Sequence, residues 1–216
     1  MNHEKLVTGP ENAAATILLA HGAGGAMDTQ WMEDMSGALT QNGFQVVRFE
    51  FEYMAARRLT GKRSPPPRAE RLQEEFVEVV EGLNGYANLL IGGKSMGGRV
   101  ASMIADNLLE KGAIAGLVCL GYPFHPIGKP EALRTAHLRD LRTPTLICQG
   151  TRDALGSKEE VQSYELSGAI DMNWLEDGDH DFKPRKAKTG LTVADNLVTA
   201  AQRVGTWARG FRQSQT

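Results

Sequence analysis

The sequence has little cysteine and few aromatic residues: two cysteines and 6% Phe, Trp and Tyr among 216 residues. Cys119 and Cys148 lie in apolar runs typical of buried strands, which favours two buried thiols over a disulfide and indicates a reducing compartment. No apolar run approaches the roughly 20 residues that span a membrane. Residues 1–5 lack the basic-then-apolar pattern of a signal peptide. We therefore expect a cytoplasmic protein.

The chain also lacks an excess of either charge. There are 24 Lys and Arg against 26 Asp and Glu, a net charge of −2, so nucleic acid and anionic membranes are not expected partners. A charged content of 23% and a hydrophobic content of 41% are ordinary for a globular domain. We expect one domain, 1–216, that takes a small-molecule substrate and is a monomer or homodimer.

Glycine is abundant, with 24 residues that gather where apolar runs end. Strand-like and helix-like patterns alternate, which predicts an α/β fold with a mostly parallel central sheet of about six or seven strands and helices on both faces. Strands are expected at 5–8, 16–20, 44–51, 89–91, 114–120, 144–149 and 170–175. Helices are expected at 29–41, 71–83, 96–111, 131–138, 158–166 and 192–211. The segment 53–68, with five basic residues around three prolines, is predicted to be irregular.

One stretch, Gly93-Lys94-Ser95-Met96-Gly97, fits the G-x-S-x-G pattern of a nucleophile elbow. In this turn a strained serine joins a strand to a helix, and the two elements pass so closely that positions 93 and 97 need glycine. A phosphate-binding loop would also contain Gly-Lys-Ser, but it needs glycine at position 88, where Asn88 stands. A solvated serine in a glycine-rich turn is the remaining alternative.

A serine nucleophile needs a base, and the base needs an acid that orients it. The chain order in proteins built on this elbow is Ser, then Asp or Glu, then His. Only His180 follows the last strand and a suitable acid, and Asp153 follows the strand at 144–149. The sequence therefore predicts Ser95, Asp153 and His180 as a catalytic triad. His21, in contrast, is expected to hold its own loop.

Acyl transfer also requires donors for the oxyanion of the tetrahedral intermediate. The N–H of Met96 begins the helix after the serine, where the helix dipole adds to its effect. The second donor is expected from Ala23, in the loop His21-Gly22-Ala23-Gly24-Gly25 after an apolar strand. The Lys94 side chain, beside the serine, is expected to pair with a carboxylate.

Aspartates 177, 179 and 181 have the spacing of a calcium loop. Such a loop would need glycine at position 182 and glutamate at position 188, where Phe182 and Lys188 stand. We therefore expect no metal and no cofactor, and we assign these aspartates to turn formation and capping.

Little in the sequence defines the substrate. Only residues 122–141 are available for a lid, so a shallow, open pocket is expected. Tyr122, Phe124 and His125 either form its wall or pack the loop. The basic loops 57–68 and 183–188 either bind an anionic substrate or are simply solvated.

The sequence resembles the α/β-hydrolase superfamily over nearly its full length. Its motifs look most like those of the small hydrolases without a cap that include testis-expressed protein 30 and the domain of NSL complex subunit 3. They are His21-Gly22-Ala23-Gly24-Gly25, the elbow extended to Arg99, 121–126, 149–153 and 177–180. The resemblance implies a lid-less α/β-hydrolase fold.

Two functional hypotheses follow from these residues. The first is a carboxylesterase-like serine hydrolase that cleaves an ester or similar acyl substrate through an acyl-enzyme. The second is a scaffold that keeps the fold without turnover, as in some relatives. An intact Ser95, Asp153 and His180 favour the first hypothesis.

Overall fold

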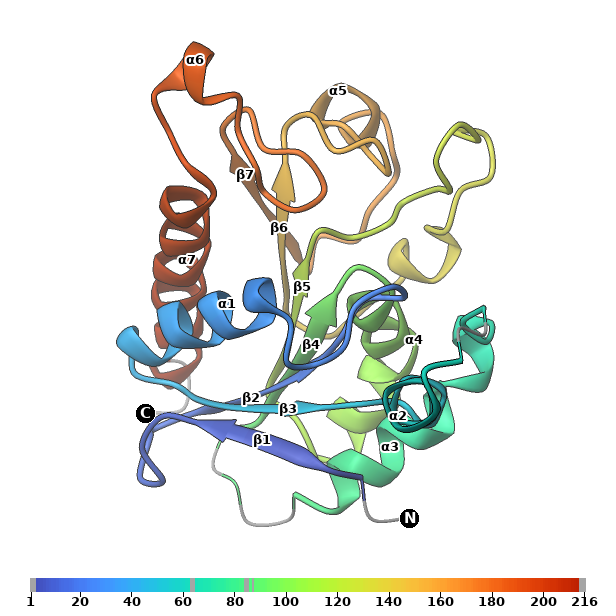
Figure 1. The fold of residues 1–216 in the computed structure, drawn as a ribbon. Coiled ribbons are helices and arrows are strands. Elements are labelled where there is room, and N and C mark those ends of the chain that lie inside the picture. The colour runs from blue at the N-terminus through green and yellow to red at the C-terminus, as the bar shows by residue number, and fades with distance from the viewer. Residues whose placement is uncertain (1–2, 63–64, 84–85, 87, 214–216) are drawn as a thin grey trace.

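The computed structural model describes residues 3–62, 65–83, 86 and 88–213. At its centre is a seven-stranded sheet in the order β1-β3-β2-β4-β5-β6-β7 (Figure 1). Strand β1 pairs antiparallel with β3, and all other pairs are parallel, which confirms the predicted mostly parallel sheet. The strands are β1 (Lys5–Thr8), β2 (Thr16–Ala20), β3 (Gln45–Phe49), β4 (Leu90–Lys94), β5 (Gly116–Leu120), β6 (Thr145–Gly150) and β7 (Ile170–Leu175).

Seven α-helices surround the sheet in the described part of the chain. Helices α1 and α7 pack against each other on one face, and α3 and α4 lie together on the other (Figure 1). None of the helices described is long and apolar enough to cross a membrane. The helices are α1 (Gln30–Gln41), α2 (Glu52–Thr60), α3 (Gln73–Glu81), α4 (Met96–Glu110), α5 (Lys158–Val161), α6 (Lys186–Thr189) and α7 (Val193–Gln213).

The central strands are buried on both faces because helices cover both sides of the sheet. Every residue of β2, β3, β4, β5 and β6 is buried. Successive side chains point to opposite faces. Leu18 therefore packs into the core under α3 and α4, while Ile17 and Leu19 pack into the core under α1 and α7. This double burial explains the continuous apolar runs in the sequence.

The prediction of an irregular segment at 53–68 is wrong in its first half, where helix α2 forms. This helix has an acidic residue, Glu52, in its first turn, and Arg57 and Arg58 in its last, as the helix dipole favours. Gly61 ends it in the left-handed conformation, with φ +69°. Two members of the basic cluster, Arg57 and Arg58, therefore belong to a helix terminus. Arg63, another member of that cluster, lies outside the described residues.

Two predicted helices are shorter than expected. At 131–138 the structure has only a 3₁₀ turn, Ala136–Leu138, because the N–H of Arg134 donates to the carbonyl of Phe124 at 2.7 Å instead of to a helical partner. At 158–166 the helix is only Lys158–Val161, with a capping box of Ser157 and Glu160. The connection from β5 to β6 thus contains no helical lid.

Candidate active site

Ser95 sits in the turn between β4 and α4, at φ +52° and ψ −116°. This is a conformation that non-glycine residues rarely adopt. A Cβ at Gly93 would lie 2.5 Å from the carbonyl oxygen of Ala20, and one at Gly97 would lie 2.6 Å from the same atom. The requirement for glycine at these two positions is therefore confirmed. The turn presents the serine at the carboxyl edge of the sheet.

Three loops bring Ser95, His180 and Asp153 together at this edge. The Oγ of Ser95 lies 2.9 Å from Nε2 of His180, and Nδ1 of His180 lies 2.8 Å from Oδ2 of Asp153. With a proton on Nδ1, the imidazole donates to the carboxylate and accepts from the hydroxyl. Asp153 is fully buried, while the His180 side chain is 27% exposed. Chemically, this arrangement can remove the hydroxyl proton and stabilise the resulting imidazolium.

Gln149 holds Asp153 in place, a role that the sequence analysis missed. Its Nε2 donates to Oδ2 of Asp153 at 2.9 Å and to the carbonyl oxygens of Tyr122 and Gly156 at 3.1 Å. The N–H of Leu155 donates to the other carboxylate oxygen at 2.8 Å. A buried amide at the carboxyl end of a largely apolar strand was the signal that could have identified Gln149.

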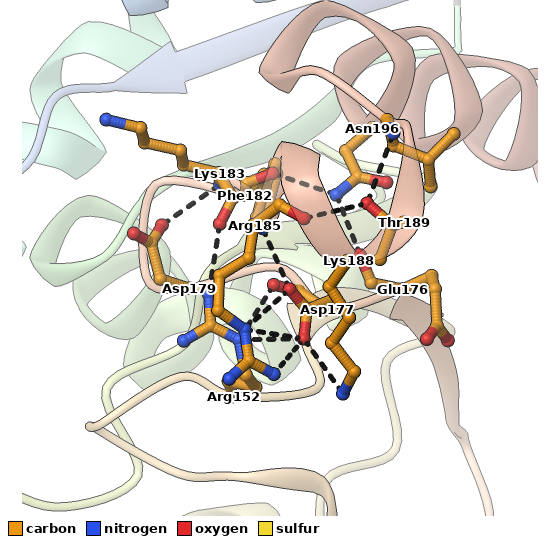
Figure 2. A network of polar contacts seen from close by, with 11 residues as sticks. Arg152, Glu176, Asp177, Asp179, Phe182, Lys183, Arg185, Lys188, Thr189 and Asn196 are labelled. Carbon is orange, nitrogen blue, oxygen red and sulfur yellow. Dashed lines mark hydrogen bonds and ion pairs between the residues drawn. The ribbon is translucent and has the colours of Figure 1, made fainter.

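The loop that presents His180 is stabilised by a buried carboxylate, Asp177 (Figure 2). Arg185 donates to both oxygens of this carboxylate, and Arg152 forms an ion pair with it at 3.1 Å. Lys188 lies 3.7 Å from the same group. The hydrogen bonds from Arg185 hold the pKa of Asp177 well below its usual range. Arg185 and Lys188 already have this anionic partner. The 183–188 loop therefore stabilises the loop that carries His180.

Asp179 supports the same loop from inside. Its Oδ1 accepts the N–H groups of Asp181 at 2.9 Å and Lys183 at 3.0 Å. Asn196, on α7, donates to the carbonyl oxygens of Glu176 and Phe182 (Figure 2). The prediction that aspartates 177, 179 and 181 form and cap the turn is thus confirmed for Asp179, whereas Asp177 pairs with arginines and Asp181 with Lys94. Both ends of the His180 loop are fixed by these contacts.

Lys94 ties the elbow directly to the histidine loop. Its Nζ donates to the carbonyl oxygen of His180 at 2.5 Å and forms an ion pair with Asp181 at 3.2 Å, which confirms the predicted pairing with a carboxylate. The ammonium group also lies 5.2 Å from the centre of the Trp31 ring. Burial lowers the pKa of Lys94, and the charge of Asp181 opposes this effect. The side chain therefore positions the loop beside the serine.

His21 is a structural residue, as predicted. Its Nε2 accepts the N–H of Phe51 at 3.2 Å, and its Nδ1 donates to the carbonyl of Gly22 at 2.7 Å. The side chain is fully buried. Burial lowers its pKa from 6.5 to about 4, so the ring is neutral at pH 7. These contacts join the loop after β2 to the start of α2.

Acid should destabilise the protein through His21. The pKa of His21 is lower in the folded state than in the unfolded state. Its contribution to the free energy of unfolding is therefore complete above pH 6.5 and falls as the pH drops toward 4. The loss for a shift of this size is about 3 kcal/mol. Urea unfolding at pH 7 and pH 4.5 should show a smaller pH-dependent loss in His21→Gln, because the amide does not titrate. An equal loss in both proteins would contradict this role for His21.

Two cavities meet at Ser95. The first, about 600 Å³, is bordered by Ser95, Met96, Ala23, prolines 66, 67 and 123, and three arginines. The second, about 540 Å³, is bordered by Ser95, Ala23, Gly22, Trp31, Met32 and His180. Both are open to solvent. Ala23 and Met96, the predicted oxyanion donors, thus lie beside the serine, and Tyr53 donates to the carbonyl of Ala23 at 3.1 Å.

The residues expected as possible wall residues lie elsewhere. Tyr122 and Phe124 are fully buried and His125 is 2% exposed, and none of the three borders either cavity. Tyr122 and Phe124 pack against each other with ring centres 4.8 Å apart. They pack the loop, the second alternative from the sequence, so the wall assignment is corrected. Pro123, between them, faces the first cavity. Among the described residues, no cluster of His, Cys, Asp and Glu could hold a metal ion.

Comparisons with known proteins agree with this architecture. A serine hydrolase without a lid from Xanthomonas campestris superposes with a TM-score of 0.71 at 20% identity, covering 95% of this chain and 89% of that one. A dienelactone hydrolase from Anabaena variabilis gives 0.69 at 18% identity, covering 95% and 90%. A serine hydrolase homologue from Coxiella burnetii gives 0.67 at 17% identity, covering 96% and 91%. At these identities the likeness shows the fold.

A match to a family model goes further than these superpositions. The model of the alpha/beta hydrolase domain matches residues 13–209, a span that contains the elbow, the glycine-rich loop 21–25 and His180. Because this match covers most of the sequence and the fold has no lid, the chain belongs to the alpha/beta hydrolase domain family.

Proposed function

We propose that the protein is a serine hydrolase that cleaves a carboxylic ester or a similar acyl substrate. Ser95 is the nucleophile, His180 the general base and Asp153 the acid that orients it. The observation that supports this most directly is the pair of hydrogen bonds linking the three side chains, at 2.9 and 2.8 Å. The motifs quoted above further support a place in the subgroup of testis-expressed protein 30.

The proposed reaction has two halves. Ser95 Oγ bonds to the acyl carbon while its proton moves to Nε2 of His180, and the N–H groups of Met96 and Ala23 stabilise the oxyanion. His180 then gives the proton to the leaving oxygen, and the alcohol departs. Water, deprotonated by His180, attacks the acyl-enzyme and releases the acid and the free serine. Asp153 remains ionised throughout and stabilises the imidazolium.

A scaffold without turnover is the competing function. It is disfavoured because the strained backbone of Ser95 and the buried, hydrogen-bonded Asp153 serve no evident purpose in a binding surface. A small fluorophosphonate probe separates the two functions, since it reacts only with an activated serine. We expect one adduct, found by peptide mass spectrometry on the fragment that contains Ser95. Absence of any adduct in the folded protein would favour the scaffold.

A further inference from the structure

The first cavity contains an unusual concentration of positive charge. Arg68, Arg99 and Arg134 border it, together with a single carboxylate, Glu70. The remaining wall is largely apolar. The three arginines come from distant parts of the chain: the segment before α3, helix α4, and the connection between β5 and β6. The fold therefore brings three arginines to the cavity that Ser95 also borders, and Arg99 follows the serine by one helical turn.

Within the described part of the chain, Glu70 is the one carboxylate beside these three positive charges, and only Arg99 forms an ion pair with it. Arg99 donates from Nη2 to Glu70 at 3.0 Å, but its Nε is buried without a hydrogen-bond partner among the described residues. No described side chain forms a hydrogen bond or ion pair with the guanidinium groups of Arg68 or Arg134. Burial lowers the pKa of Arg134 and the positive charge of Arg99 lowers it further, while Tyr122 and the carboxylate of Glu70 oppose this effect. An anion bound here would relieve this repulsion and satisfy the free donors.

The position of His180 indicates which part of a substrate enters the cavity. His180 borders the second cavity and not the first, whereas Met96 borders the first and not the second. In the proposed reaction the histidine must protonate the leaving oxygen. In that reaction the leaving group would lie in the second cavity, against Trp31 and Met32. The acyl chain would then extend past Met96 into the cavity of the arginines.

We propose that the acyl chain of the substrate ends in a carboxylate, so that the substrate is a monoester of a dicarboxylic acid. This inference rests on the serine hydrolase function proposed above. Hydrolysis of such a monoester adds one water, breaks the acyl–oxygen bond, and yields a dicarboxylate, an alcohol and a proton. The pair between Glu70 and Arg99 shows that a carboxylate fits beside these guanidinium groups. A substrate carboxylate would bind in the same way and would compete with Glu70 for Arg99. The planar guanidinium fork binds two carboxylate oxygens at once.

The test compares matched esters that differ only in the end of the acyl chain. The mono(4-nitrophenyl) esters of glutarate, adipate and pimelate are set against 4-nitrophenyl pentanoate, hexanoate and heptanoate, at low ionic strength. The measured quantity is the ratio of kcat/KM for the charged ester to that for its neutral partner. We expect a ratio of about 10 or more for the best chain length, because a charge-assisted hydrogen bond strengthens binding by about tenfold or more.

Two variants change this ratio in opposite directions. Arg134→Met should lower it roughly tenfold, since one of the free guanidinium groups is lost. Glu70→Gln should raise it roughly threefold, because the competing carboxylate is removed while a hydrogen-bond acceptor for Arg99 remains. Arg139→Met is the matched control. Arg139 lies in the same connection but pairs with Glu165 outside the cavity, so the ratio should not change.

The outcomes separate this inference from the function on which it rests. If neutral esters are cleaved and Ser95 is labelled, but the ratio is at or below one and insensitive to both variants, the carboxylate inference is overturned and the hydrolase function stands. If no ester is cleaved and Ser95 is never labelled, both fail. Glu70 is 53% exposed, so Glu70→Gln should fold normally and keep the inference testable even if Arg134→Met does not.

Discussion

Ser95→Ala is expected to lower kcat on a 4-nitrophenyl ester by about 10⁵-fold or more. The substitution removes the only hydroxyl within hydrogen-bond distance of Nε2 of His180 among the described residues, while leaving the neighbouring backbone donors in place. In serine hydrolases, loss of the nucleophile lowers kcat by about 10⁶-fold. The fold should be unaffected, because the side chain is small and half-buried. Initial rates and circular dichroism of both proteins would measure the two effects.

A double substitution makes this test sharper. If the serine and the histidine act as one unit, His180→Ala should cost about as much as Ser95→Ala, and the double variant no more than either. A matched control exists in Ser102, whose Oγ lies 2.8 Å from Nε2 of His137. Ser102 is 2% exposed and borders neither cavity, so Ser102→Ala should leave the rate on the 4-nitrophenyl ester unchanged. Additive losses for Ser95 and His180, or full activity of Ser95→Ala, would contradict the assigned roles.

The order of strands and helices along the chain was predictable because each element is indicated by its own local sequence. A buried parallel strand is a continuous apolar run, and most of these runs are followed by glycine within a few residues, β3 being an exception. The close packing at the elbow can also be inferred from sequence, since a side chain at Gly93 or Gly97 would collide with Ala20. The contact between Ser95, Asp153 and His180 follows from three loops at one sheet edge.

The features that were missed depend on contacts between distant segments. Helix α2 was not predicted because Arg57 and Arg58 suggested an irregular basic segment. A helix C-terminus accommodates such charges. The orientation of Tyr122 and Phe124 depends on what packs beneath them, and here Gly156 leaves room: a Cβ there would lie 2.6 Å from the Phe124 ring. Aromatic residues beside a site resemble wall residues in sequence, although their burial directs them inward. The guanidinium cluster likewise becomes visible only when α4 and two loops are in place.

Gly92→Ala is expected to destabilise the protein more than any other glycine-to-alanine change in the sheet. Gly92 lies in β4, beside β5, and a Cβ there would lie 1.9 Å from the carbonyl oxygen of Val118 and 2.8 Å from its carbonyl carbon. Both atoms are backbone in a central strand, so relief requires the two strands to separate. Their hydrogen bonds also fix the elbow, because the N–H of Ser95 donates to the carbonyl of Leu120 at 3.0 Å.

The expected loss for Gly92→Ala is about 4 kcal/mol or more, a large part of the stability of an ordinary domain. Gly37→Ala is the matched control: it lies in α1 with nothing within 4 Å of an added Cβ, so it should stabilise the protein by about 0.8 kcal/mol. Urea unfolding of the three proteins, followed by circular dichroism, measures both effects. A Gly92→Ala protein as stable as the parent would mean that β4 and β5 do not approach this closely. Because the strand pair supports Ser95, any folded Gly92→Ala protein should lose fluorophosphonate labelling together with stability, whereas Gly37→Ala should retain it.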